Sequence, residues 1–586
     1  MDKSKITKSL AVFASVLLIV IIGVASFAYF GTFNVNLVNN VAVNINSSSP
    51  GDATFTSNTS QLNLQVPAAN MSFTVANNTV AAKEDIAFLD VTLTGSSNLL
   101  TTCTYDIVYE YDAGSNVYGQ GTTTKTSGAT KEITIEVNGM NGNNHFATET
   151  NFDHASIQSY YDSTNKYYKL VEGATIQSLG TEQSVRWKII GRYYNLNVSQ
   201  AQLGGKNFTG KIYAISKGCS SEDGSSVKKG YETILANNGG AASMTTLTST
   251  DFANVTTASD KGMYKAQDDL GTSYYFRGAV DNNWVKYGKY TKDMYNCNNG
   301  TISATDTGNS CTKIASSGDD IYWRLIRING DGSIRMIYSG VTPPTESTKV
   351  IKTADTSLGK SPFNAKYDSA EYDSAEYVGY MYTIGEQHGT SKSSDIKTYL
   401  EDWYANYTDL NKTGTKITDQ IYCNDRTVST SDVAYSPTNY TTLTSWNSKG
   451  TTYYYGTNGR VYNNPVSPDY KCPVASDKFT TTTAKGNGKL SYPVGLITAD
   501  EITFAGLPAR KTNNSFYLYT GDYYWAGSPF VFDGSISDEC CVDDGGGLLM
   551  DYVFVDGLYG VRGVVSLSSE SKLLGSGTYN DVYTVN

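Results

Sequence analysis

The side chains best suited to chemistry in this sequence are the acidic residues between Phe516 and Val561. This stretch of 46 residues contains no Asn, Lys, Arg, His or Gln. Its acidic residues are Asp522, Asp533, Asp538, Glu539, Asp543, Asp544, Asp551 and Asp556. Carboxylates at this density suit a cationic, hydroxyl-rich or calcium-bridged ligand. Most of the formal net charge of −11 therefore falls in a small part of the chain.

Tyr, Phe, Ser and Gly fill the rest of this stretch. Binding loops use such residues because they combine rigid contact area with adaptable hydrogen bonding. We therefore expect exposed aromatic anchors among the carboxylates. The predicted ligand-binding residues are Tyr523, Tyr524, Trp525, Phe530, Phe532, Asp533, Ser535, Asp538, Asp543, Asp544, Asp551, Tyr552, Phe554 and Asp556. The alternative is a set of acidic loops with buried aromatic side chains, and the sequence favours neither.

The adjacent pair Cys540–Cys541 is the one feature here that could suggest catalysis. No His or Lys lies near enough in sequence to lower a thiol pKa, and the surrounding carboxylates raise it. The chain has no GxSxG serine motif, zincin helix or phosphate loop. Carboxylate pairs could serve glycoside hydrolysis, but a solvated acidic face is the commoner explanation. We predict no catalytic residues and no enzymatic activity.

Metal and nucleic-acid partners are not indicated by the composition. No two of the three histidines are close in sequence, and no CxxC pair has metal spacing. Asn329, Asp331 and Ser333 alternate as in a calcium loop, but the closing glutamate is missing, which favours a plain turn. We expect no cofactor, with calcium as the alternative. No basic stripe accompanies the aromatic residues, so we expect no nucleic-acid partner.

Eight cysteines suit an oxidising compartment. Two pairs could close loops as disulfides, Cys297 with Cys311 and Cys423 with Cys472. Cys103 and Cys219 lie in the first half and are left unassigned. Free thiols in a reducing compartment remain the alternative.

The N-terminal segment gives the expected location. Residues 10–30 form an uncharged run long enough to span a bilayer, and Lys3, Lys5 and Lys8 precede it. We therefore expect a single-pass cell-membrane protein whose C-terminal part is extracellular. The alternative is that this segment is a cleaved signal peptide. The expected partners are the membrane, through this segment, and an unknown protein or glycan on another cell or host surface.

The patterns of the remaining chain predict a mainly β fold. Period-two alternation, as in Ile133, Ile135 and Val137, predicts half-buried strands in the first half. In the second half, the spacing over 394–407 predicts a helix capped by Ser394, and Thr498 with Glu501 forms a capping box. The predicted segments are 1–9 (basic end), 10–30 (anchor or signal), 31–63 (spacer), 64–220 (β-sandwich), 221–260 (linker helix) and 261–586 (α+β domain).

Stretches in each half of the chain resemble known families. The run "SFAYFGTFNVNLV" and the stretch "NLNVSQAQLGGKNFTGKIYAIS" resemble the exported TasA/camelysin-like β-sandwiches of Firmicutes. In the second half, "GTSYYFRGAVDNNWVKYG", "YWRLIRINGDGSIRMIYSG", "YPVGLITADEITFAG" and "YYWAGSP" resemble a C-terminal domain of gut Firmicutes surface proteins. That resemblance implies a C-type-lectin-like fold of the formylglycine-generating-enzyme type. The family usually reads "VRPVVSL", and Gly563 stands here in place of Pro.

The stretch 516–561 also resembles the variable region of proteins diversified by retroelements, in which randomised Asn codons leave an Asn-free segment. Together these resemblances imply a cell-surface ligand-binding protein or adhesin. The alternatives are a structural pilus-like or matrix subunit and, less favoured, a formylglycine-generating-type oxidase or a hydrolase.

Overall fold

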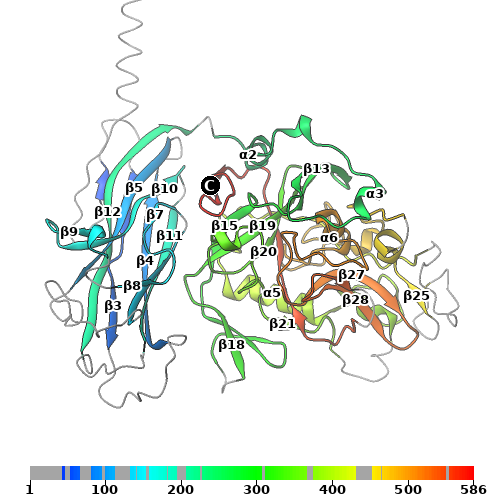
Figure 1. The fold of residues 1–586 in the computed structure, drawn as a ribbon. Coiled ribbons are helices and arrows are strands. Elements are labelled where there is room, and N and C mark those ends of the chain that lie inside the picture. The colour runs from blue at the N-terminus through cyan, green and yellow to red at the C-terminus, as the bar shows by residue number, and fades with distance from the viewer. Residues whose placement is uncertain are drawn as a thin grey trace, which may run out of the picture. The chain divides into compact units, whose positions relative to one another are not determined.

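The computed structural model describes residues 43–45, 53–65, 81–95, 99–111, 132–139, 141–152, 157–180, 182–194, 206–224, 227–306, 310–365, 374–429, 446, 452–462, 465–549 and 553–586. The chain divides into two compact units, residues 1–227 with 586 (unit 1) and residues 228–585 (unit 2). Strands dominate the described residues of both units (Figure 1). The prediction of a mainly β chain is therefore confirmed.

Unit 1 is built from two sheets that share one hydrophobic core. The first sheet has the order β1 (Val43–Ile45), β2 (Ala53–Ser57), β4 (Ala81–Thr94), β11 (Gln183–Tyr194), β6 (Ile133–Asn138) and β8 (Thr150–Asn151). The second has the order β3 (Ser60–Gln65), β12 (Asn207–Asp223), β5 (Leu99–Tyr111), β10 (Tyr167–Ser178) and β7 (Asn143–Asn144), with β9 (Tyr161–Asp162) beside β10. Residues 31–63, expected as a spacer, thus contribute β1, β2 and the start of β3.

The core of unit 1 follows from the alternation in its strands. Trp187 of β11 is fully buried and donates its indole N–H to the hydroxyl of Tyr105 on β5, at 3.0 Å. A disulfide joins Cys103 of β5 to Cys219 of β12. The first contact links the two sheets across the core, and the disulfide joins two paired strands of the second sheet.

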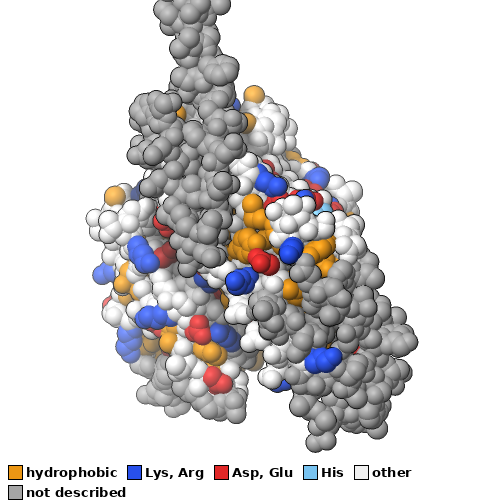
Figure 2. Space-filling model, turned by 90° about the vertical axis from the view of Figure 1, so that its left-hand side faces the viewer, with side chains coloured by type: hydrophobic (Ala, Val, Ile, Leu, Met, Phe, Trp, Pro, Cys, Tyr) orange, Lys and Arg blue, Asp and Glu red, His pale blue; other side chains and the backbone are white. Residues whose placement is uncertain are grey.

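Charged side chains of unit 1 are largely paired. Arg186 lies 2.8 Å from Asp90, and Arg192 bridges Glu84 and Glu136 at 2.7 and 2.6 Å. Figure 2 shows one face of the molecule on which basic and acidic side chains are interspersed rather than gathered by sign. Partly exposed pairs of this kind contribute little to stability.

Unit 2 has a central sheet of eight strands. Its order is β13 (Lys261–Asp268), β14 (Gly271–Gly278), β19 (Asp320–Ile328), β15 (Trp284–Lys289), β33 (Tyr583–Val585) and β32 (Leu573–Leu574), with β20 (Ile334–Tyr338) joining β19 to β31 (Val564–Leu567). β19 and β20 are buried along their whole length, and they form a hairpin whose turn contains Asn329 and Asp331.

A second, six-stranded sheet of unit 2 carries the acidic stretch. Its order is β21 (Lys360–Ser361), β30 (Tyr559–Gly560), β27 (Tyr524–Phe532), β28 (Ser537–Val542) and β29 (Leu548–Leu549), with β25 (Tyr453–Tyr454) beside β27. Three smaller sheets pair β16 (Met294–Cys297) with β17 (Ile302–Ser303) and β18 (Cys311–Ala315), β22 (Met381–Tyr382) with β23 (Lys392–Ser393), and β24 (Tyr422–Cys423) with β26 (Lys478–Phe479).

Four α-helices of unit 2 lie within the described residues: α2 (Gly230–Asn237), α3 (Ser249–Phe252), α5 (Asp395–Tyr407) and α6 (Ala499–Ala505). Ser394 caps α5 by accepting from the N–H of Lys397, as its position in the sequence predicts. Thr498 and Glu501 form the predicted capping box of α6. The sequence signals for these two helix starts are therefore confirmed.

The expected single-pass membrane location is corrected. Within the ranges that the structure describes, no helix is long and apolar enough to cross a membrane. Residues 10–30, on which the expectation rested, lie outside the described residues.

Candidate functional site

Four of the predicted aromatic anchors are core residues rather than exposed contacts. Tyr524, Trp525, Phe530 and Phe532 all lie on β27 and are at most 2% exposed. β27 is an interior strand of its sheet, with β30 on one side and β28 on the other. Their exposure, as predicted from the sequence, is wrong because the segment is a strand buried on both faces.

Small residues in the middle of β27 explain this burial. Gly527 donates its N–H to the carbonyl of Ile497 at 2.8 Å, and a Cβ on Gly527 would lie 3.1 Å from that of Leu496. The hydroxyl of Ser528 accepts the N–H of Ala499 at 2.9 Å. The run Ala526–Ser528 thus lets the start of α6 approach the sheet closely, which covers this face of β27.

The other predicted site residues differ in burial and in structural role. Asp538 is 5% exposed and belongs to the interior of β28. Asp533 closes a turn by accepting the N–H groups of Ser535 and Ile536 at 2.7 and 2.6 Å. Asp544 and Asp556 are exposed, and Asp543 and Phe554 are half-buried. Asp551 and Tyr552 lie outside the described residues.

A partly exposed cluster remains at the edge of this stretch, and we name it the aromatic–acidic rim. It consists of Tyr519, Tyr523, Asp543, Asp544 and Tyr559. The hydroxyl of Tyr519 donates to the carbonyl of Asp544 at 2.9 Å, and the rings of Tyr523 and Tyr559 stack with centroids 5.4 Å apart. The structure therefore retains Tyr523, Asp543 and Asp544 from the predicted set and adds Tyr519 and Tyr559.

The electrostatics of the rim link its two kinds of residue. Partial desolvation raises the pKa of Tyr523, and the nearby carboxylates of Asp544 and Asp543 raise it further. A phenol beside two carboxylates stays protonated and can donate a hydrogen bond, while the carboxylates attract a cation. The rim can thus contact a ligand through ring faces and negative charge together.

Cys540 and Cys541 are both buried and are free thiols in the structure. Burial raises the pKa of both thiols, and neighbouring carboxylates raise it further. A thiol with a raised pKa holds little thiolate at neutral pH and is a poor nucleophile. The other six cysteines form disulfides: Cys103–Cys219, Cys297–Cys311 and Cys423–Cys472.

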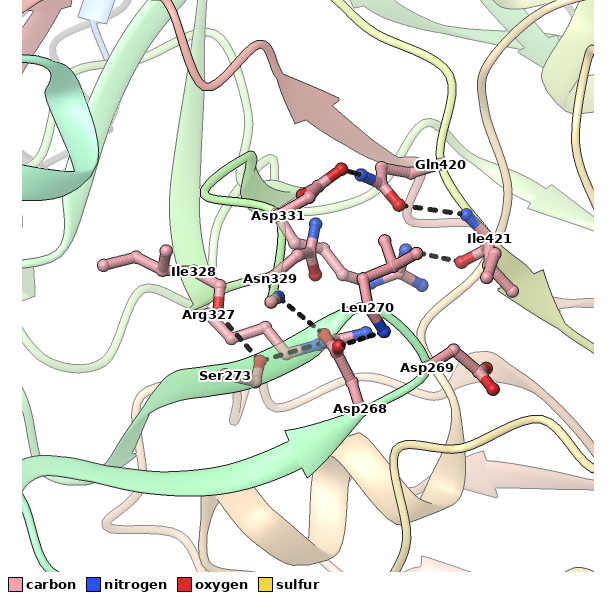
Figure 3. A network of polar contacts seen from close by, with 12 residues as sticks. Asp268, Asp269, Leu270, Ser273, Arg327, Ile328, Asn329, Asp331, Gln420 and Ile421 are labelled. Carbon is pink, nitrogen blue, oxygen red and sulfur yellow. Dashed lines mark hydrogen bonds and ion pairs between the residues drawn. The ribbon is translucent and has the colours of Figure 1, made fainter. Parts of the chain in front are cut away.

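A second region with unusual chemistry lies in unit 2, on the side of α6 and the β13–β14 turn. It is a small polar hollow that is partly open to solvent. Its floor is a buried ion network in which Glu501 contacts Arg335 at 2.6 Å and Arg327 at 3.1 Å. Arg327 also lies 2.7 Å from Asp268 (Figure 3).

Burial alone would raise the pKa of Glu501, but the guanidinium groups of Arg335 and Arg327 outweigh it and lower the pKa below its ordinary value. A third arginine, Arg460, bridges Asp425 and Asp500 at 2.7 and 2.8 Å on another wall. Each of these arginines is thus paired with at least one carboxylate, and the ion pairs join residues that are distant in sequence.

The loop that resembled a calcium site is a turn, as the sequence favoured. Asp331 accepts both the N–H and the hydroxyl of Ser333 at 3.0 and 2.6 Å, and it accepts from Gln420 at 2.6 Å and Lys485 at 2.7 Å. Among the described residues, no group of three or more His, Cys, Asp or Glu side chains is arranged to hold a metal ion.

Comparison of the chain with protein-family models, curated proteins and solved structures finds no match. Function is therefore inferred from the geometry of these two regions.

Sequence reasoning missed most of the polar hollow. The sequence places Glu501 at the start of a helix, which is confirmed, but it does not identify the arginine partners of this residue. One signal was available: Arg324, Arg327 and Arg335 interrupt two otherwise apolar strands. Arginines in buried strands require carboxylate or carbonyl partners.

Proposed function

We propose that the chain is an extracytoplasmic ligand-binding protein of the adhesin type, and that the aromatic–acidic rim is its contact surface. The observation that carries this proposal is the stacked, half-exposed pair Tyr523–Tyr559 beside Asp543 and Asp544. Tyrosine is favoured at binding surfaces because a large ring contacts the partner at low entropic cost. Three disulfides fit an oxidising compartment.

The ligand that fits the rim best is a positively charged protein surface. Lys or Arg side chains can place their charge over a tyrosine ring face and pair with a carboxylate at the same time. Leu549 of β29 and Leu558, the residue before β30, are 36% and 44% exposed and add apolar area on the same sheet. A glycan is the other partner class that the test distinguishes.

The family resemblance supports the same proposal at the level of fold. We propose that unit 1 is a β-sandwich of the TasA/camelysin type and that unit 2 is a C-type-lectin-like domain. The rim belongs to the Asn-free stretch that resembles a retroelement-diversified region. A near-identical genomic repeat with Asn codons, beside a reverse-transcriptase gene, would support diversification; the absence of both would refute it.

The experiment is a binding screen of the full chain against arrays of basic proteins, acidic proteins and glycans. We expect capture of basic proteins, weakened as salt concentration rises. For the strongest partner, the double variant Asp543→Asn, Asp544→Asn should raise Kd by about tenfold or more. The matched control is Glu346→Gln with Glu570→Gln, which removes two charges from exposed ion pairs elsewhere.

Tyr523→Ser should weaken binding as strongly as the double aspartate variant, since it removes the ring face. Equal binding by the rim and control variants would refute the assignment of the contact surface. Absence of any partner across the three arrays, with a folded protein, would refute the adhesin function itself. Capture of glycans alone would refute the cationic-protein ligand.

A further inference from the structure

The side-chain amide of Asn329 has a fixed orientation in the polar hollow. The single proton of the Ser333 hydroxyl goes to Asp331, at 2.6 Å, so the oxygen of Ser333 can only accept further bonds. It accepts from Gln420 Nε2 at 2.7 Å and from Asn329 Nδ2 at 2.8 Å. The Nδ2 donor of Asn329 therefore faces Ser333, and its acceptor Oδ1 remains available to a ligand in the hollow.

This acceptor has no protein partner although the residue is buried. Asn329 is 3% exposed, and its Oδ1 makes no hydrogen bond within the described part of the chain. Figure 3 shows Asn329 between the turn that carries Asp268 and the segment that carries Gln420. Buried carbonyl oxygens are almost always hydrogen-bonded, so a donor from a ligand or from water is expected here.

The charge of the hollow determines what kind of donor fits. Its lining contains two more carboxylates than cations. Arg327, Arg335 and Arg460 are already committed to Asp268, Glu501, Asp425 and Asp500 at 3.1 Å or less. Asp469 also lines the hollow and is exposed to solvent. It accepts the backbone N–H of Lys471, and no cationic partner for it is found among the described residues.

The walls of the hollow are held rigidly. A disulfide joins Cys423, which lines the hollow, to Cys472, the residue after the lining residue Lys471. Asp268 anchors the backbone of Leu270 and Gly330 at 2.7 and 2.9 Å. A site held in this way before binding loses little conformational entropy when a ligand enters.

We propose that the polar hollow binds a primary ammonium group, with one N–H donated to Asn329 Oδ1 and the positive charge facing Asp469. This site is separate from the aromatic–acidic rim and does not depend on the function proposed for it. An amino sugar, a polyamine and the side chain of lysine all carry this group.

The test uses ligand-observed saturation-transfer NMR with the full chain. Methylammonium is the minimal probe, and tetramethylammonium is its matched control, because it carries the same charge without an N–H. We expect saturation transfer to methylammonium only. Glucosamine, spermidine and Nα-acetyllysine then distinguish the three sources, with N-acetylglucosamine as the uncharged control for the sugar.

Two variants locate the binding. Asn329→Ala should raise the Kd of methylammonium by about tenfold, since it removes a hydrogen bond to a charged donor. Asp469→Asn, at an exposed position where folding is not at risk, should raise it by about two- to fivefold. Glu570→Gln, which removes an exposed carboxylate outside the hollow, should leave it unchanged.

Equal saturation transfer to methylammonium and tetramethylammonium would overturn the proposal, as would unchanged Kd in the Asp469→Asn variant. Failure of every ammonium probe to bind the folded wild-type chain would mean that water alone satisfies Asn329, and it would also overturn the proposal. Should Asn329→Ala fail to fold, the Asp469→Asn result decides.

Discussion

The ring of Tyr559 contacts the buried indole of Trp525 edge-on, with ring centroids 4.8 Å apart. Trp525 is itself fixed, because it is fully buried and donates its Nε1–H to the carbonyl of Ser361 at 2.8 Å. Tyr559 in turn stacks on Tyr523. Trp525, which the sequence predicts to contact ligand, is thus a core residue. It supports the half-exposed pair Tyr523–Tyr559 and keeps the aromatic–acidic rim ordered.

The first prediction tests this support. Tyr559→Ala should lower the free energy of unfolding of unit 2 by more than about 0.5–1.5 kcal/mol, because the contribution of an aromatic pair adds to that of the buried ring area. Tyr559→Phe keeps both ring contacts and should leave stability unchanged. Urea unfolding followed by tryptophan fluorescence measures this, since five of the six tryptophans belong to unit 2. Equal stability of the Ala and Phe variants would contradict the supporting role.

The second prediction concerns the ion network beneath the polar hollow. Glu501→Gln preserves the shape of the side chain and its acceptor for the N–H of Thr498, but it leaves Arg327 and Arg335 without their shared carboxylate. We expect a loss of about 3–5 kcal/mol, because an uncompensated charge remains buried. The exposed pair Lys229–Glu570 provides the control, and Glu570→Gln should change stability by less than about 0.5 kcal/mol.

The pH dependence of the same residue has a definite sign. The folded-state pKa of Glu501 is lowered, so its ionised form stabilises the fold above the ordinary carboxyl pKa, and this contribution is lost as pH falls through the folded-state value. Wild-type protein should therefore lose stability towards acid more steeply than Glu501→Gln. Parallel acid-unfolding curves for the two proteins would contradict the pairing.

The third prediction concerns Gly563, a position that is tightly packed against buried side chains. A Cβ there would lie 2.9 Å from Cζ3 of Trp403 and 3.3 Å from Cδ2 of Leu400, both fully buried. Trp403 cannot move easily, since its Nε1–H donates to the hydroxyl of Tyr290 at 3.1 Å. Gly563→Ala should therefore cost about 1–3 kcal/mol through overpacking. At Gly262 the nearest atom to such a Cβ is 3.6 Å away, so Gly262→Ala is the matched control and should be nearly neutral.

Helix starts and the disulfides within unit 2 could be predicted because their signals are local. Ser394 and Thr498 indicate the starts of α5 and α6, because helix capping involves only three or four consecutive residues. The membership of Tyr524 and Trp525 in the core could not be predicted in the same way. An apolar run of this length fits an exposed aromatic loop as well as a buried strand until its neighbours β28 and β30 are known.

The polar hollow depended on long-range contacts to an even greater degree. Arg327 and Glu501 are separated by 174 residues and meet only because α6 packs on the β13–β14 hairpin side of the central sheet. No local pattern records such a meeting. The Asn329 turn could be recognised from the sequence, yet the direction of its amide depends on Gln420, a residue 87 positions after Ser333.

The last prediction concerns Glu539, which lies in the interior of β28 and is fully buried. Neither of its carboxylate oxygens has a hydrogen-bond partner within the described residues. Burial raises the pKa of this side chain well above its ordinary value, Arg426 opposes the rise and Asp538 adds to it. The folded state therefore holds Glu539 protonated where the unfolded chain would ionise it.

This arrangement makes the fold less stable as pH rises. Below the ordinary glutamate pKa both states are protonated and Glu539 has no pH-dependent effect; above it the unfolded state loses a proton that the folded state keeps, so the free energy of unfolding falls until the folded-state pKa is reached. Glu539→Met removes both the titration and the unpaired oxygens, and it should stabilise unit 2 at pH 7 by about 1–3 kcal/mol. Glu539→Gln should gain less, because it keeps buried polar atoms. Urea unfolding at pH 5 and pH 8 checks this: the advantage of the Met variant should grow with pH, and an advantage that shrinks would show that Glu539 is ionised and paired in the folded protein.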